Sequence, residues 1–120
     1  MYRNKNGGIR MDGYTLRNQE RELYNVTMRD IREFTNIMAE DNDEFIVLYA
    51  PEEINGITFL QAARYGEEDE ISLQAGIMKD GKPDVMEKTA SKKECLDAFT
   101  KYFKYKETPD LSSFTLLKRM

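Results

Sequence analysis

Two Asx-Gly dipeptides constrain the fold of this chain more than any other feature. Asn55-Gly56 and Asp80-Gly81 each lie between short segments rich in apolar residues. Both central positions of a type I′ turn require positive φ, which Asn, Asp and Gly tolerate best, so each dipeptide predicts a two-residue β-hairpin. Because hairpins join antiparallel strands, we expect an antiparallel sheet.

The segments around these turns predict a meander of four strands. Residues 45–50 form an apolar run that is too short for a buried helix, and Pro51 is expected to end this strand because proline cannot donate to the ladder. Residues 57–64 follow the first turn, and residues 71–78 alternate between apolar and polar side chains. Residues 85–89 return after the second turn.

Two amphipathic helices are predicted, one before and one after this meander. Thr27 and Asp30 resemble a capping box, and apolar residues follow them at helical spacing. Ser91 and Glu94 form a complete capping box ahead of a second apolar stripe. We expect both helices to pack on one face of the sheet, which makes a two-layer α+β domain.

The two ends of the chain leave more than one interpretation open. Residues 1–10 are polar and rich in Gly and Asn, which predicts a flexible tail ahead of a single domain over residues 11–120. Residues 11–26 fit a short strand with a connector. Residues 114–117 fit either a last edge strand or a docked segment.

The absence of histidine restricts the chemistry more than any other fact of composition. It removes the commonest general base, the commonest zinc ligand and the usual partner of a Ser or Cys nucleophile. The single cysteine, Cys95, cannot form an internal disulfide, and its place on the apolar stripe of the second helix predicts a packing residue. We therefore expect a protein that is not an enzyme and that needs neither a metal nor a cofactor.

The sequence also predicts a cytoplasmic protein that does not bind membranes. No apolar run approaches the ~20 residues of a membrane span. The basic residues near the N-terminus are not followed by the apolar stretch of a signal peptide. A lone cysteine fits a reducing compartment.

Negative charge is concentrated in the middle of the chain. From Glu33 to Glu70 there are eleven carboxylates against one cation, Arg64. They cluster in three connections, of which the first and third can lie at the same end of a meander. Such a field steers a basic protein partner and repels nucleic acid, although acidic turns can also be solvated loop tips and nothing more. The candidate partner-binding residues are Asp41, Asp43, Glu44, Glu52, Glu53, Glu67, Glu68, Asp69 and Glu70.

Three segments of the meander resemble a known group of proteins: Glu44–Leu48, Ile57–Ala63 and Ile71–Ala75. Together with the closing helix, over about residues 44–104, they resemble the small immunity proteins of bacterial polymorphic-toxin and contact-dependent growth inhibition systems. The resemblance implies a binding protein that blocks a cognate toxin domain, commonly a nuclease. Such a protein inhibits by contact and without turnover.

Two other classes of function stay open. One is a regulatory or small-ligand-sensing domain, which could be a homodimer. The other is a small enzyme with a carboxylate pair, although no spacing in the sequence nominates the pair. A deep pocket would favour these two classes, and an open acidic face would favour the immunity protein.

Overall fold

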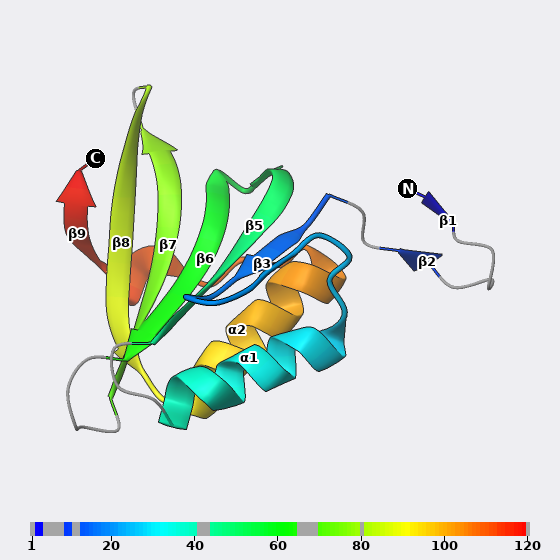
Figure 1. Ribbon diagram of the computed structural model, residues 1–120. Coiled ribbons are helices and arrows are strands. Elements are labelled where there is room, and N and C mark those ends of the chain that lie inside the picture. Colours follow the sequence, from blue (N-terminus) through cyan, green and yellow to red (C-terminus); the bar gives the residue numbers. More distant parts are fainter. Residues whose placement is uncertain are drawn as a thin grey trace.

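The protein is built from one large antiparallel sheet and two helices (Figure 1). The structure is a computed structural model and describes residues 2–3, 9–10, 13–40, 44–64, 70–79 and 81–119. The elements in chain order are β1 (Tyr2–Arg3), β2 (Ile9–Arg10), β3 (Thr15–Arg17), β4 (Glu22–Leu23), α1 (Met28–Glu40), β5 (Phe45–Ile54), β6 (Ile57–Arg64), β7 (Ile71–Lys79), β8 (Lys82–Ala90), α2 (Lys92–Tyr105), a 3₁₀ turn η1 (Leu111–Ser113) and β9 (Thr115–Arg119).

The large sheet confirms the α+β class but corrects the predicted number of strands. Within the described part of the chain it has seven strands in the order β4-β3-β5-β6-β7-β8-β9, and every neighbouring pair is antiparallel. The predicted meander of four strands is its centre, β5 to β8. The prediction missed β4. β3 lies in residues 11–26, where a short strand was expected, and β9 agrees with the edge strand left open for residues 114–117. None of the three was part of the predicted meander, because strands of two to five residues are too short to show a clear alternation.

Pro51 does not end β5, contrary to the prediction. The strand continues to Ile54, and its pairing with β6 shifts register between Tyr49 and Ile54. Pro51 lies inside this irregular stretch, where a missing N–H does not interrupt a regular ladder. The first turn follows as predicted, with Asn55 at φ 51° and Gly56 at φ 82°.

Both helices begin at the predicted capping boxes. Thr27 Oγ1 accepts a hydrogen bond from the Asp30 N–H at 3.2 Å, and the Thr27 N–H donates to Asp30 Oδ2 at 3.0 Å. Ser91 Oγ accepts from the Glu94 N–H at 3.1 Å, and the Ser91 N–H donates to Glu94 Oε1 at 3.4 Å. These bonds join residues three positions apart, so the sequence alone could place them.

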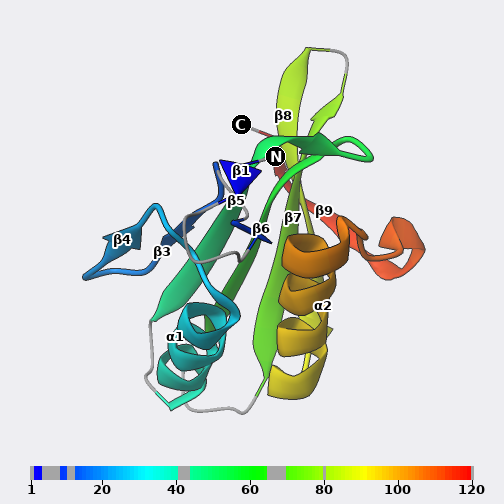
Figure 2. The same cartoon turned by 90° about the vertical axis from the view of Figure 1, so that its right-hand side faces the viewer.

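The two helices pack on the same face of the sheet, as predicted (Figure 2). The core fills the space between these two layers. Its fully buried side chains include Leu16, Ile46, Leu48 and Leu60 from the strands, Ile31, Phe34 and Met38 from α1, and Cys95, Phe99 and Tyr102 from α2. Removing this apolar surface from water is the main stabilising term of the fold.

No described helix or strand covers the opposite face of the sheet (Figures 1 and 2). Tyr49, Phe59 and Gly76 lie side by side on it across β5, β6 and β7. The rings of Tyr49 and Phe59 are 5.7 Å apart, and the Phe59 ring lies over Gly76. The Phe59 ring therefore covers part of this face and contacts both neighbouring strands.

Both interpretations that the sequence left open for residues 114–117 hold in the structure. Phe114 is buried against the core, and β9 follows it as the edge strand beside β8. At the other end, β1 and β2 pair with each other in a separate two-stranded sheet. Most of residues 1–10 lie outside the described residues, so the flexible tail stays a prediction.

Candidate functional site

The structure describes four of the nine predicted partner-binding residues. Glu44 is buried, whereas Glu52, Glu53 and Glu70 are exposed. The other five lie outside the described residues; they are Asp41, Asp43, Glu67, Glu68 and Asp69.

Glu44 has a structural role inside the protein. Its side chain is 7% exposed, and its Oε1 accepts hydrogen bonds from the N–H groups of Phe45 at 3.0 Å and Gln19 at 3.2 Å. The carboxylate thereby ties the start of β5 to the turn between β3 and β4. Because the Gln19 partner lies 25 positions away, the sequence pattern could not separate Glu44 from the exposed carboxylates around it.

Strand direction divides the predicted residues between the two ends of the sheet. β5 and β7 begin at the same end, so Glu44 and Glu70 lie there, and the backbone N–H of Arg64 donates to the Glu44 carbonyl at 3.2 Å. Glu52 and Glu53 lie at the opposite end, next to the turn that joins β5 to β6 (Figure 1). The described acidic residues therefore do not form one continuous surface.

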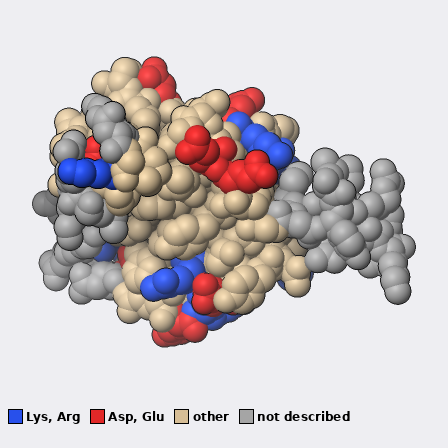
Figure 3. Space-filling model, turned by 90° about the horizontal axis from the view of Figure 1, so that it is seen from above, with Lys and Arg blue, Asp and Glu red and all other residues tan. Residues whose placement is uncertain are grey.

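Glu52 and Glu53 form a candidate site with a pocket beside them. Its volume is about 320 Å³, and it is lined by Tyr14, Pro51, Glu52, Glu53, Ile54 and Lys106; we call these six residues the hairpin site. Neither carboxylate has a hydrogen-bond or ion-pair partner among the described residues. Figure 3 looks onto this end of the molecule and shows a group of carboxylates on its surface with a cationic side chain close by.

The backbone of the hairpin site is held in place by packing and hydrogen bonds. Gly13 has φ 90°, and a Cβ at this position would lie 2.6 Å from Cβ of Pro51, so only glycine lets the two segments approach. The Asn55 amide donates to Thr108 Oγ1 at 3.1 Å, which joins the β5–β6 turn to the segment after α2. The Tyr102 hydroxyl donates to the Ile57 carbonyl at 3.0 Å.

Tyr14 forms the inner side of the hairpin site. Its hydroxyl donates to the Tyr102 carbonyl at 3.0 Å, and its ring packs edge-on against Phe103 with centroids 5.0 Å apart. Burial raises the pKa of the Tyr14 hydroxyl, so the group stays neutral and keeps donating at physiological pH. Two carboxylates and the Lys106 ammonium remain as the charges of the site, and its net charge is negative.

The sequence predicted the carboxylates of this site but missed its other members. Tyr14 lies in the segment 11–26, whose pattern was ambiguous. Lys106 ends α2 in the left-handed conformation at φ 53°, and it reaches the β5–β6 turn only through the packing of α2 on the sheet. No local signal in the sequence links either residue to Glu52 and Glu53.

Cys95 is buried, as predicted, and burial raises the pKa of its thiol to about 12. In the unfolded chain the thiol ionises near pH 8.5. The stability that the buried neutral thiol contributes is therefore complete below pH ~8.5 and is lost as the pH rises toward 12.

Alkylation tests this assignment cleanly, because Cys95 is the only cysteine. At pH 8 we expect iodoacetamide to label the native protein at least about a hundredfold more slowly than the urea-unfolded protein, since the thiolate is the reactive form. Mass spectrometry of timed samples gives both rates. Equal rates would show that Cys95 is accessible and not a packing residue.

The described residues contain no group of three or more His, Cys, Asp or Glu side chains placed to hold a metal ion. None of the described helices is long and apolar enough to cross a membrane.

The comparisons with known proteins leave the chain without an assigned family. No protein-family model, curated protein or solved structure shows significant similarity to it. The resemblance to immunity proteins therefore stays a prediction.

Proposed function

We propose that this chain is a non-enzymatic protein-binding module that recognises a basic partner through the hairpin site. The observation that supports this most directly is the pair Glu52 and Glu53, two exposed neighbouring carboxylates without partners among the described residues. Both project from a bulged strand whose turn is tied to α2 and to the segment after it. Because the backbone that carries these carboxylates is already held in place, binding does not have to order it.

The partner class proposed first is a toxin domain, in line with the resemblance to immunity proteins. Nucleases carry basic surfaces that bind phosphates, and an acidic protein surface can occupy them in place of nucleic acid. The chain would then neutralise the toxin by contact in the cytoplasm. Glu70 is exposed at the other end of the sheet, where a larger partner could also reach it, and Glu67, Glu68 and Asp69 precede it in the sequence.

A capture experiment followed by charge reversal tests this proposal. The tagged protein is used to capture a partner from the lysate of its native host at low salt, and the affinity of the purified partner is then measured. We expect Glu52→Lys with Glu53→Lys to weaken that affinity at least about tenfold, because both attractive charges become repulsive. The affinity of the original pair should fall as ionic strength rises, since salt screens exposed charges.

A matched control separates the hairpin site from overall charge. Glu20→Lys with Glu22→Lys makes the same change in net charge at exposed positions in the β3–β4 turn and at the start of β4, and we expect it to leave the affinity nearly unchanged. Equal losses in the two double variants would show that net charge alone steers the partner. Unchanged affinity in the Glu52 and Glu53 variant would reject the hairpin site, and Glu70→Lys would then test the other end.

The alternative function, a small-ligand-sensing domain, is supported by a different part of the molecule. A second pocket lies beside α2, away from Glu52 and Glu53.

A further inference from the structure

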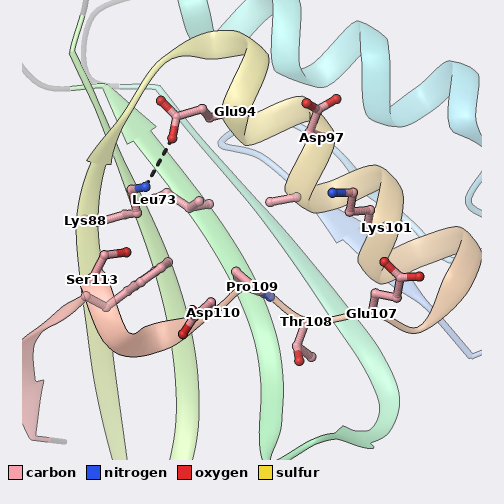
Figure 4. A pocket seen from close by; sticks show the side chains of 12 residues that line it. Leu73, Lys88, Glu94, Asp97, Lys101, Glu107, Thr108, Pro109, Asp110 and Ser113 are labelled. Atoms are coloured by element: carbon pink, nitrogen blue, oxygen red, sulfur yellow. Dashed lines mark hydrogen bonds and ion pairs between the residues drawn. The ribbon is translucent and has the colours of Figure 1, made fainter.

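A second pocket lies between α2, β8 and the segment that follows α2 (Figure 4). Its volume is about 370 Å³, within the range of ~300–1,000 Å³ that is typical of small-molecule sites. Leu73, Ala98 and Phe114 provide apolar surface, whereas the remaining lining residues are mostly charged. None of its lining residues belongs to the hairpin site.

The segment after α2 forms the outer wall of this pocket, and hydrogen bonds hold it in place without a ligand. After α2, the Glu107 N–H donates to the Lys101 carbonyl at 3.1 Å, and the Thr108 hydroxyl accepts from Asn55 at 3.1 Å. Pro109 then restricts the backbone further. Figure 4 shows the segment running from the end of α2 toward β8 and so bounding the pocket on one side.

Part of the charge around the pocket is balanced within the protein. Lys88 Nζ is 3.2 Å from Glu94 Oε2, and this ion pair lowers the pKa of Glu94. Asp97 precedes Lys101 by four positions on α2, a spacing at which an acid and a base attract each other along a helix. Lys88 is therefore paired with Glu94, and Asp97 lies about one helical turn from Lys101.

Two further carboxylates, Glu107 and Asp110, line the pocket, and neither forms an ion pair with another described residue. The pocket is lined by four carboxylates against two amines. Asp110 accepts a hydrogen bond from the Ser112 N–H at 2.9 Å, and this bond lowers the pKa of its carboxyl group. Its negative charge therefore persists at physiological pH, next to an apolar surface.

We propose that this pocket binds an ammonium or guanidinium group carried on an alkyl chain. The cation lies against Glu107 and Asp110, and the alkyl chain covers Leu73, Ala98 and Phe114. This arrangement suits amphipathic cations, whose apolar stems prefer apolar surfaces while their heads meet charge and water. Lysine or arginine side chains of a protein and free aliphatic diamines share this chemistry.

Titration of the ¹⁵N-labelled full chain by NMR tests the proposal. The probes are Nα-acetyl-lysine methylamide, Nα-acetyl-arginine methylamide, 1,5-diaminopentane and, as the neutral analogue, Nα-acetyl-norleucine methylamide. We expect the cationic probes to produce saturable shifts around α2 and residues 107–114, and the norleucine probe to produce none. Binding by the capped amino acids identifies a protein side chain as the source, and binding by the diamine alone identifies a free amine.

Substitutions in the pocket test which side chains bind the cationic probes. Glu107→Gln with Asp110→Asn should weaken binding of the cationic probes about five- to tenfold, the loss expected for two exposed charge pairs. Asparagine still accepts the bond from Ser112 N–H, so the turn should persist. Ala98→Leu narrows the pocket without changing its charge and should also reduce binding, and thermal melting confirms that each variant folds.

A matched double variant keeps this inference separate from the proposed function. Glu52→Gln with Glu53→Gln removes the same charge from the hairpin site and should leave binding of the probes unchanged. Three results would overturn the inference: no saturable shifts, equal binding of the norleucine probe, or undiminished binding in the Glu107 and Asp110 variant. None of them bears on binding of a basic partner by Glu52 and Glu53.

Discussion

Replacing Phe99 with alanine is expected to lower the free energy of unfolding by about 4 kcal/mol. The Phe99 side chain is fully buried in α2 and faces the sheet. Its removal loses the transfer free energy of the ring and leaves a cavity that the surrounding core fills only in part. Since small domains are stable by about 5–15 kcal/mol, this single change takes a large share of the total. Urea unfolding followed by circular dichroism measures the difference.

Tyr105 provides the matched control for this prediction. It is an aromatic residue at the end of the same helix, but it is 63% exposed. Tyr105→Ala should change the free energy of unfolding by no more than about 0.5 kcal/mol. A similar loss in both variants would mean that helix formation and not burial decides the effect, and that α2 does not pack as described.

Replacing Gly76 with valine is expected to cost about 2–3 kcal/mol of stability. A Cβ at this position of β7 would lie 2.1 Å from Cε2 of Phe59, far inside any normal contact. The Phe59 ring must therefore leave its place over β7 and give up its contact with Tyr49. Overpacking of this kind typically costs 1–3 kcal/mol, and it should outweigh the better strand propensity of valine.

A double-mutant cycle with Phe59 tests whether the clash with its ring causes this loss of stability. In a Phe59→Ala background the Cβ of residue 76 meets no ring, so Gly76→Val should cost little or even stabilise the strand. The coupling energy between the two positions should then approach the cost of the single Gly76→Val change. Independent effects of the two substitutions would show that the ring does not lie over Gly76.

The division of the acidic residues has a consequence for how a partner can bind. Glu52 and Glu53 lie at one end of the sheet, and Glu70 lies at the other. A small basic domain that contacts one of these ends leaves the other free. Charge reversal at each end in turn should therefore separate a partner that uses one end from a partner that spans the sheet.

The candidate site was predictable in its charges but not in its shape. Exposure of Glu52 and Glu53 followed from their position next to a turn, because charged residues at turns are rarely buried. Glu44 carries the same charge and is buried, since two backbone N–H groups meet its carboxylate. Whether a carboxylate finds such donors depends on the packing of distant segments, which no local pattern records.

The sequence by itself determined the features that depend on residues close together in the chain. The two capping boxes, the hairpin at Asn55-Gly56, the central strands and the apolar stripe through Cys95 and Phe99 all depend on residues a few positions apart. Local hydrogen bonds, backbone preferences and side-chain periodicity act at that range. These features placed the helices and the centre of the sheet correctly.

Only the tertiary structure decided the rest. β3 pairs with the open edge of β5, β4 pairs in turn with β3, and β9 pairs with the open edge of β8. β5 continues past Pro51 because its ladder with β6 is already irregular there. The two pockets arise where the segment after α2 meets the β5–β6 turn on one side and β8 on the other. Contacts between segments far apart in the chain form only when the sheet and helices pack. That packing places Glu52 and Lys106 around one pocket and Lys88 and Asp110 around the other.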